Sequence, residues 1–135
     1  MTEPTYTVSF WLRKIAVLVD GSENSFRALE LALDFAMRYG SQITVIHACD
    51  TCNETEISEK IKRRVNDRAE YELKILKYSS KESSTANEIL KYLSENTYDA
   101  VIMGARGLSI NSELNIGSVA MSVALNATTT VILVR

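Results

Sequence analysis

The chain ends in the stretch DAVIMGARGLSINSELNIGSVAMSVALNATTTVILVR, residues 99–135, which combines two apolar runs with a glycine-containing loop and a helix-like segment. The runs YDAVIMGA (98–105) and TTTVILVR (128–135) are short and rich in β-branched residues, which is typical of buried strands. Between them, GSVAMSVALNA (117–127) predicts a helix. A strand, a helix and a second strand in this order predict a right-handed crossover between parallel strands.

The same alternation precedes this unit. The runs RKIAVLVDG (13–21) and QITVIHA (42–48) have the composition of two further buried strands. A helix between them is expected to be capped by Ser22 or Ser25 and to end at Gly40. A short, highly charged helix is expected after residue 48, because apolar residues recur there at helical spacing.

The middle of the chain completes the pattern. The run YELKILKY (71–78) alternates imperfectly and could either prolong the charged helix or form an edge strand, of which we favour the strand. Thr85 and Glu88 have the spacing of a capping box at the start of another helix. The resulting order, β-α-β-α-β-α-β-α-β, predicts an α/β fold with a parallel sheet between helices. Ligands of such sheets bind at the carboxyl ends of the strands, where the winding direction reverses.

Composition limits the class of protein. With 135 residues, 46% of them hydrophobic and 24% charged, and a net charge of -2, the chain has the character of one soluble globular domain. We assign residues 13–135 to that domain and residues 1–12 to an N-terminal extension. No basic stripe interleaved with aromatics predicts nucleic-acid binding, and no apolar run reaches the roughly 20 residues that span a bilayer. Since the N-terminus also lacks the pattern of a signal peptide, we expect a cytoplasmic protein.

The two cysteines form one C-x-x-C motif, Cys49 and Cys52, and the single histidine, His47, lies just before it. A closed structural zinc site needs four ligands, and these are the chain's three soft ones. A thioredoxin-like site would need the first cysteine at a helix N-terminus. We therefore expect two reduced, chemically idle thiols and a structural histidine, with metal binding or redox sensing as the alternatives.

Three glycines and a serine follow the strand at 98–105 with the spacing G-x2-G-x9-G-S: Gly104, Gly107, Gly117 and Ser118. A glycine directly after a strand lets a ligand approach the backbone, and the amides at a helix N-terminus favour a phosphate. The Ser118 hydroxyl adds a donor, and Arg106 is the one fixed positive charge of this loop. The pattern is neither a P-loop nor the dinucleotide fingerprint, because no lysine precedes Ser118 and no G-x-G-x-x-G occurs.

This motif closely resembles the nucleotide-binding signature of the universal stress protein family. VLVDGSENSFRALELA (17–32) also resembles the family's first strand and helix, and VIHACD (45–50) resembles the end of its second strand, where His47 falls at the family's histidine position. The similarity covers about residues 13–135. It implies an open five-stranded parallel sheet with helices on both faces and strand order 3-2-1-4-5, a Rossmann-like fold of the adenine nucleotide alpha hydrolase type. It also implies that ATP or another adenine nucleotide binds at the strand ends, with Mg²⁺ or Mn²⁺ held through the phosphates.

Carried across residue by residue, the resemblance implies two groups of site residues. Those expected to meet adenine or ribose are Asp20, the backbones of Val19 and Ala48, Met103 and Gly104. Those expected around the phosphates are Gly107, Gly117, Ser118, Val119 and, at a variable position of the motif, Arg106. The acidic Glu113 in the loop LSINSELNI (108–116) makes a triphosphate a less firm expectation than an adenine nucleotide in general.

The last strand predicts an assembly. TTTVILVR is apolar, lacks proline and is uncharged until Arg135, so as an exposed sheet edge it would invite pairing. The resemblance implies a homodimer through this strand, between Thr129 and Val134, about a two-fold axis. We expect a nucleotide-binding regulator of stress or energy state. The alternatives are a nucleotide-free interaction protein and, because no general base or activated nucleophile is evident, at most a very slow ATPase.

Overall fold

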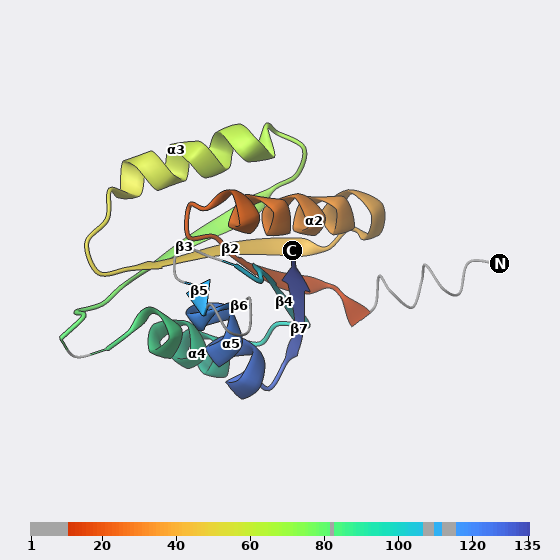
Figure 1. The fold of residues 1–135 in the computed structure, drawn as a ribbon. Coiled ribbons are helices and arrows are strands. Elements are labelled where there is room, and N and C mark those ends of the chain that lie inside the picture. The colour runs from red at the N-terminus through yellow and green to blue at the C-terminus, as the bar shows by residue number, and fades with distance from the viewer. Residues whose placement is uncertain (1–10, 82, 107–109, 112–115) are drawn as a thin grey trace.

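The fold is built on one parallel sheet. The computed structural model describes residues 11–81, 83–106, 110–111 and 116–135, and its sheet has the order β3-β2-β1-β4-β7 (Figure 1). The strands are β1 (Lys14–Leu18), β2 (Gln42–Cys49), β3 (Tyr71–Lys77), β4 (Ala100–Gly104) and β7 (Thr130–Val134). Since β7 is the fifth strand of this sheet along the chain, the observed order corresponds to the expected order 3-2-1-4-5.

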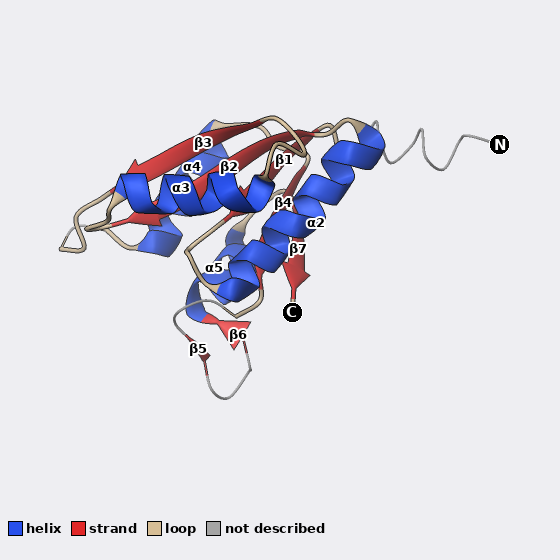
Figure 2. Ribbon diagram, turned by 90° about the horizontal axis from the view of Figure 1, so that it is seen from above, coloured by secondary structure: helices blue, strands red, loops and turns tan. Residues whose placement is uncertain are grey.

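Helices cover both faces of the sheet, as Figure 2 shows from above. The described helices are α2 (Glu23–Tyr39), α3 (Glu54–Val65), α4 (Thr85–Glu95) and α5 (Ser118–Asn126). α2 and α3 lie on one face, and α4 and α5 lie on the other (Figure 1). Within the described part of the chain, no helix has the length and apolar character that crossing a membrane requires.

The central strand β1 contributes side chains to both halves of the core. Ile15 and Val17 pack on the side of α2 and α3, whereas Ala16 and Leu18 pack on the side of α4 and α5. All four are buried, which explains why β1 is a continuous apolar run rather than an alternating one. Burying an aliphatic side chain of this size contributes about 1.5–3 kcal/mol, so both layers are anchored on this strand.

Residues 71–77 form the edge strand that we favoured over a longer helix. α3 ends because Asn66 and Asp67 adopt left-handed backbone conformations, with φ of 48° and 59°. The chain then pairs in parallel with β2, from Ile43 opposite Tyr71 to Cys49 opposite Lys77. The strand is therefore placed at the edge by a backbone reversal at Asn66 and Asp67.

The structure shows which residues are the N-caps of α2 and α4. Ser22, of the two serines considered, caps α2 and accepts a hydrogen bond from the Ser25 amide at 3.1 Å. The expectation that Thr85 caps α4 is wrong, because Ser84 is the N-cap and accepts from the Asn87 amide at 3.2 Å. The Thr85 hydroxyl instead hydrogen-bonds with that of Tyr78, so it is engaged with the segment after β3.

The segment between β4 and α5, expected to be a loop, contains a small second sheet. β5 (Ile110–Asn111) and β6 (Ile116–Gly117) pair antiparallel, with Ile110 opposite Gly117. β6 leads directly into α5.

Candidate functional site

A cavity of about 430 Å³ opens at the carboxyl ends of β1, β2 and β4. This volume is within the range of roughly 300–1,000 Å³ that small-molecule sites occupy. The cavity lies where β2 and β3 extend to one side of β1, and β4 and β7 to the other. It therefore occupies the reversal point at which open parallel sheets bind ligands.

The described lining of the cavity is mostly apolar. Apolar side chains come from the strand ends and from α4 and α5: Leu18, Val19, Ile46, Ala48, Ile89, Met103, Val119 and Ala120. Asp20 and Arg106 are the charged side chains among the described lining residues. Such a surface suits a flat, weakly polar group held by a few polar anchors.

Most of the residues expected from the sequence come together here. The cavity is lined by Val19, Asp20, Ala48, Met103, Gly104, Arg106, Gly117 and Val119. Ser118, the first residue of α5, is exposed and is not part of the lining. Gly107 and Glu113 lie outside the described residues.

The backbone of Val19 already makes two internal hydrogen bonds. Its amide donates to the Ile46 carbonyl at 2.9 Å, and its carbonyl lies 2.7 Å from Nδ1 of His47. Since a carbonyl only accepts, this Nδ1 carries the proton and Nε2 is left with the lone pair. His47 is buried and bonded, which agrees with its expected structural role. A ligand can use only the remaining lone pair of the Val19 carbonyl.

Asp20 and Gly21 form the turn that leads from β1 into α2. The Asp20 carboxylate accepts a hydrogen bond from the Ser22 amide at 2.8 Å, which holds the turn. Gly21 has a φ of 99°, a conformation that a β-carbon disfavours. The turn aims a half-buried carboxylate at the cavity, so Asp20 serves the local fold and lines the site.

Gly104 has a structural reason to be glycine that the sequence did not reveal. A β-carbon at this position would lie 2.6 Å from Oδ1 and 2.9 Å from Cγ of Asn24. That amide side chain accepts from the Arg106 amide at 2.7 Å and donates to the Val134 carbonyl at 3.0 Å. Asn24 thus links the start of α2 to the loop after β4 and to the end of β7. Gly104 leaves space for the Asn24 side chain.

The N-terminus of α5 borders the cavity through Val119 and Ala120. Its N-cap, Gly117, supplies no side-chain hydrogen bond to the helix, and the Gly117 amide donates to the Ala105 carbonyl at 2.6 Å. That amide is committed to the fold. The positive end of the helix dipole remains at the cavity, where it favours an anion.

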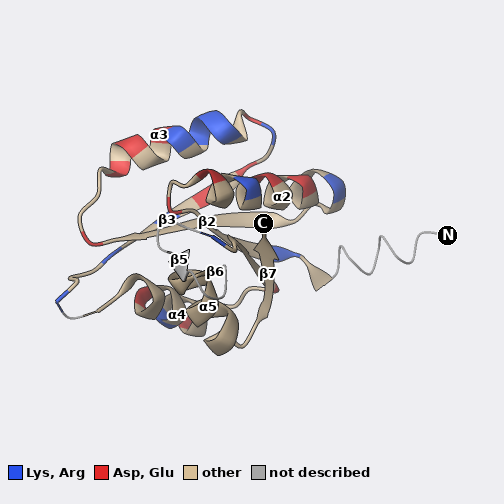
Figure 3. Ribbon diagram, in the orientation of Figure 1, with Lys and Arg blue, Asp and Glu red and all other residues tan. Residues whose placement is uncertain are grey.

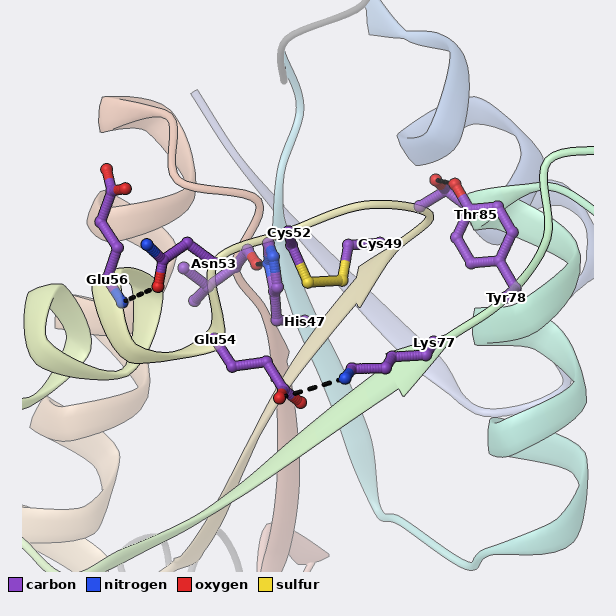
Figure 4. Close-up of a disulfide and its surroundings, with 10 residues drawn as sticks. His47, Cys49, Cys52, Asn53, Glu54, Glu56, Lys77, Tyr78 and Thr85 are labelled. Carbon is purple, nitrogen blue, oxygen red and sulfur yellow. Dashed lines mark hydrogen bonds and ion pairs between the residues drawn. A yellow bond between two sulfur atoms is a disulfide. The ribbon is translucent and has the colours of Figure 1, made fainter.

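The C-x-x-C motif also lies on the cavity wall, and the expectation of two free thiols is wrong. Cys49 and Cys52 form a disulfide, shown in Figure 4 beside His47. Cys49 ends β2 and Cys52 lies just before α3, with 5.9 Å between their Cα atoms. This separation is within the range of about 4.4–6.8 Å that a disulfide bridges, because the chain turns back between the two residues.

Several lining residues were not expected from the sequence. They are Ser22, Ser25, Ile46, Thr51, Cys52, Thr85, Ile89 and Ala120, besides Leu18, His47 and Cys49. Asn24, which joins the start of α2 to the loop after β4 and to the end of β7, was also missed, because its hydrogen-bond partners lie 82 and 110 residues away. A polar residue in the first turn of a helix that follows a buried strand is the one signal that could have drawn attention to it.

Comparison with known proteins gives a consistent result. The model of the universal stress protein family matches residues 12–135. A protein of Thermus aquaticus named "Universal stress protein in QAH/OAS sulfhydrylase 3'region" is 29% identical over 135 residues, covering 91% of this chain and 98% of its own length.

Solved structures share the fold. A universal stress protein in complex with cAMP has a TM-score of 0.74 at 22% identity and covers 91% of this chain and 96% of its own. The universal stress protein from Archaeoglobus fulgidus in complex with dAMP has a TM-score of 0.67 at 24% identity, with coverages of 90% and 97%. Both likenesses concern the α/β architecture described above.

Proposed function

The chain belongs to the universal stress protein family, and from this membership we propose that it binds an adenine nucleotide in the cavity at the carboxyl ends of β1, β2 and β4. The observation that carries the proposal is the position of an apolar cavity of about 430 Å³ at the reversal point of the sheet. Similar structures hold cAMP and dAMP, which supports the choice of an adenine ring.

The adenine ring fits the apolar part of the cavity. Ile46, Ala48 and Met103 offer contacts to the faces and edges of a flat ring. The Ala48 backbone would meet the adenine edge, and the Val19 carbonyl offers its second lone pair to the exocyclic amine. Apolar contact would supply most of the affinity, while these few polar groups would supply orientation.

The sugar and phosphates fit the polar end of the cavity. Asp20 lines this end of the cavity, and a carboxylate is a suitable acceptor for hydrogen bonds from ribose hydroxyls. Arg106 and the N-terminus of α5 supply positive potential for the phosphates. Since Asp20 is the one carboxylate of the described lining, Mg²⁺ or Mn²⁺ would be carried mainly by the phosphates.

Isothermal titration with AMP, ADP, ATP and cAMP, each with and without Mg²⁺, tests the proposal. For the 23 non-hydrogen atoms of AMP, about 0.3 kcal/mol per atom corresponds to about 7 kcal/mol, or a Kd on the order of 10 μM. No binding of any of these nucleotides at millimolar concentration would reject nucleotide binding and favour a nucleotide-free interaction protein. Following nucleotide turnover in the same samples tests for slow ATP hydrolysis.

A negative charge introduced at Val119 tests whether the phosphates bind beside this residue. Val119→Glu would place a carboxylate beside the phosphates, where unit charges about 5 Å apart repel by about 3 kcal/mol at an effective dielectric of about 20. We expect the variant to bind AMP at least about tenfold more weakly than Val119→Gln, because every 1.4 kcal/mol is about tenfold. The two variants lose the same apolar contacts, and Glu suits a first helical turn. Equal AMP affinities would place the phosphate elsewhere.

We also propose that the protein is a homodimer that pairs through β7. β7 is an edge strand, and Figure 3 shows that β7 and α5 carry no charged residues, in contrast to α2 and α3. Leu133 on β7 is 38% exposed and Leu125 on α5 is 77% exposed, whereas the opposite edge, β3, is flanked by the ion pair between Lys77 and Glu54. An apolar, uncharged edge favours pairing with a second copy.

The role that fits these properties is regulatory. A cytoplasmic dimer whose conformation or partners change with the bound nucleotide would report the energy or stress state of the cell. Mass spectrometry of ligand released from protein purified without added nucleotide would identify the nucleotide that occupies the site in the cell.

A further inference from the structure

A histidine and two cysteines meet on the wall of the cavity, at the end of β2. One ring nitrogen of His47 and the sulfur atoms of Cys49 and Cys52 all lie within 4.8 Å of one another. Figure 4 shows the His47 side chain beside the disulfide. The proposed nucleotide contacts do not involve these three side chains.

The strand β2 fixes two of the three groups. His47 and Cys49 are two residues apart on one strand, so their side chains point to the same face of the sheet. Both are buried, and the Cys49 carbonyl accepts from the Tyr78 amide of the neighbouring segment at 3.2 Å. Side chains on a rigid strand are better positioned to bind a ligand than side chains on a loop.

The hydrogen bond of His47 leaves one nitrogen of its ring able to bind a metal. Its Nδ1 lies 2.7 Å from the Val19 carbonyl and donates to it, which leaves the Nε2 lone pair free to bind a cation. Histidines that bind metals usually donate their other ring N–H to a carbonyl or carboxylate, which fixes the ring and its tautomer. The bond that holds His47 in the fold is therefore also the bond that would orient it toward a metal.

Cys52 can adjust to complete the site. It lies in the short segment between β2 and α3 and is half-buried, so its sulfur can move without disturbing the sheet. Around a tetrahedral Zn²⁺ with Zn–S of about 2.3 Å and Zn–N of about 2.0 Å, ligand atoms lie about 3.5–3.8 Å apart. Since the three atoms already lie within 4.8 Å of one another, only a small rearrangement is needed.

We propose that the reduced protein binds one Zn²⁺ through Nε2 of His47 and the thiolates of Cys49 and Cys52, and that disulfide formation prevents this binding. Two cysteine thiolates and one histidine make a three-ligand set that leaves a fourth position open. Because all three residues line the cavity, that position is available to water or to a molecule in the cavity. This site goes beyond the proposed nucleotide binding and does not depend on it.

The two states are linked by a balanced thiol exchange. Two molecules of a thiol reductant, RSH, supply two electrons and two protons to the bond between Cys49 and Cys52, and they leave as the disulfide RSSR. The two protein thiols then lose their protons when Zn²⁺ binds their sulfur atoms. A disulfide sulfur carries no thiolate charge, so the oxidised protein lacks the two strongest ligands.

Co²⁺ is a spectroscopic probe for this site in the whole protein. The chain has two cysteines and one histidine, so any thiolate-to-cobalt charge-transfer absorption must come from this pair. We expect the reduced protein to develop that absorption with a stoichiometry of one Co²⁺ per chain and to lose it when Zn²⁺ is added. The oxidised protein should develop none. Absence of the absorption in reduced protein with fully titratable thiols would overturn the proposal.

Variants separate the site from general metal binding. Cys52→Ser should weaken Co²⁺ binding by more than about 100-fold, because loss of an outer hydrogen-bond partner alone costs about 10–100-fold. Thr55→Ala, a change at an exposed residue of α3 that lies outside the cavity lining and removes no ligand, should bind Co²⁺ like the original protein. His47→Gln, compared after circular dichroism shows a folded chain, should shift the d–d bands that report nitrogen ligation. Wild-type affinity and spectrum in Cys52→Ser would equally overturn the proposal.

Discussion

Replacing Gly104 by alanine tests whether this glycine serves the fold rather than only a ligand. The new β-carbon would lie 2.6 Å from Oδ1 and 2.9 Å from Cγ of Asn24, closer than such carbons approach other atoms. The Asn24 side chain would have to move and would lose its hydrogen bonds to the Arg106 amide and the Val134 carbonyl. Gly104→Ala should therefore loosen the junction between α2, β4 and β7.

The magnitude follows from these two bonds. Each contributes about 0.5–1.5 kcal/mol, so Asn24→Ala should lower the free energy of unfolding by about 1–3 kcal/mol. Gly104→Ala should cost at least as much. In the Asn24→Ala background the contacts with Oδ1 and Cγ are gone, and the backbone carbonyl carbon of residue 24 lies 3.1 Å away. The alanine should then cost less than about 1 kcal/mol, which gives a coupling energy of about 1–2 kcal/mol.

Urea unfolding of the two single variants and the double variant measures this coupling. Asn24→Asp is a matched control, because it keeps the acceptor for the Arg106 amide and removes the donor to the Val134 carbonyl. It should lose at least the stability of the bond to Val134, because a carboxylate oxygen then faces the Val134 carbonyl. If Gly104→Ala costs the same in both backgrounds, the proposed role of Asn24 is wrong, and close approach of a ligand becomes the better explanation for the glycine.

Two further predictions concern the assembly and the surface. Leu133→Lys introduces a charge at the β7 edge and should shift sedimentation toward the monomer. The control Met37→Lys, at a 51% exposed residue on α2, should leave sedimentation unchanged. A monomeric original protein would refute pairing through β7. A hydrogen bond from Arg68 is the main cause that lowers the pKa of Glu30 in the folded chain, so this group stabilises the fold above the ordinary glutamate pKa and loses that effect as pH falls. By urea unfolding, Glu30→Gln should accordingly cost less than about 1 kcal/mol at pH 7, and less at pH 3 than at pH 7. An equal cost at both pH values would contradict the assignment.

The fold could be predicted from the sequence because the residue patterns that indicate its strands and helices are local. The buried strands at 13–21 and 98–105 are continuous apolar runs, and Gly40 ends the first helix in a left-handed conformation, with φ of 73°. Such signals depend on the backbone and on neighbours within a few residues. Even the uncertain run at 71–78 was resolved by a local feature, the backbone reversal at Asn66 and Asp67.

The location of the cavity could be predicted for the same reason. The carboxyl ends of parallel strands meet at one edge of the sheet, so Asp20, Ala48 and Gly104 could be expected to lie together once the strands were assigned. Their surroundings were not predictable in the same way. The thiols expected to be free are joined, because the turn after β2 brings Cys49 and Cys52 together. The cap expected at Thr85 lies one residue earlier, at Ser84, while the Thr85 hydroxyl bonds to Tyr78.

By itself the sequence determined the order of strands and helices, the family and the edge of the sheet at which a site could form. Only the tertiary structure decided what Gly104 and Gly117 contribute to the fold and which side chains share the cavity wall. Gly104 must be small because of Asn24, and the Gly117 amide is used by Ala105. The physical reason is that propensity and periodicity act between near neighbours, whereas contacts between residues 80 or more positions apart, such as Asn24 with Arg106, depend on how complete elements pack.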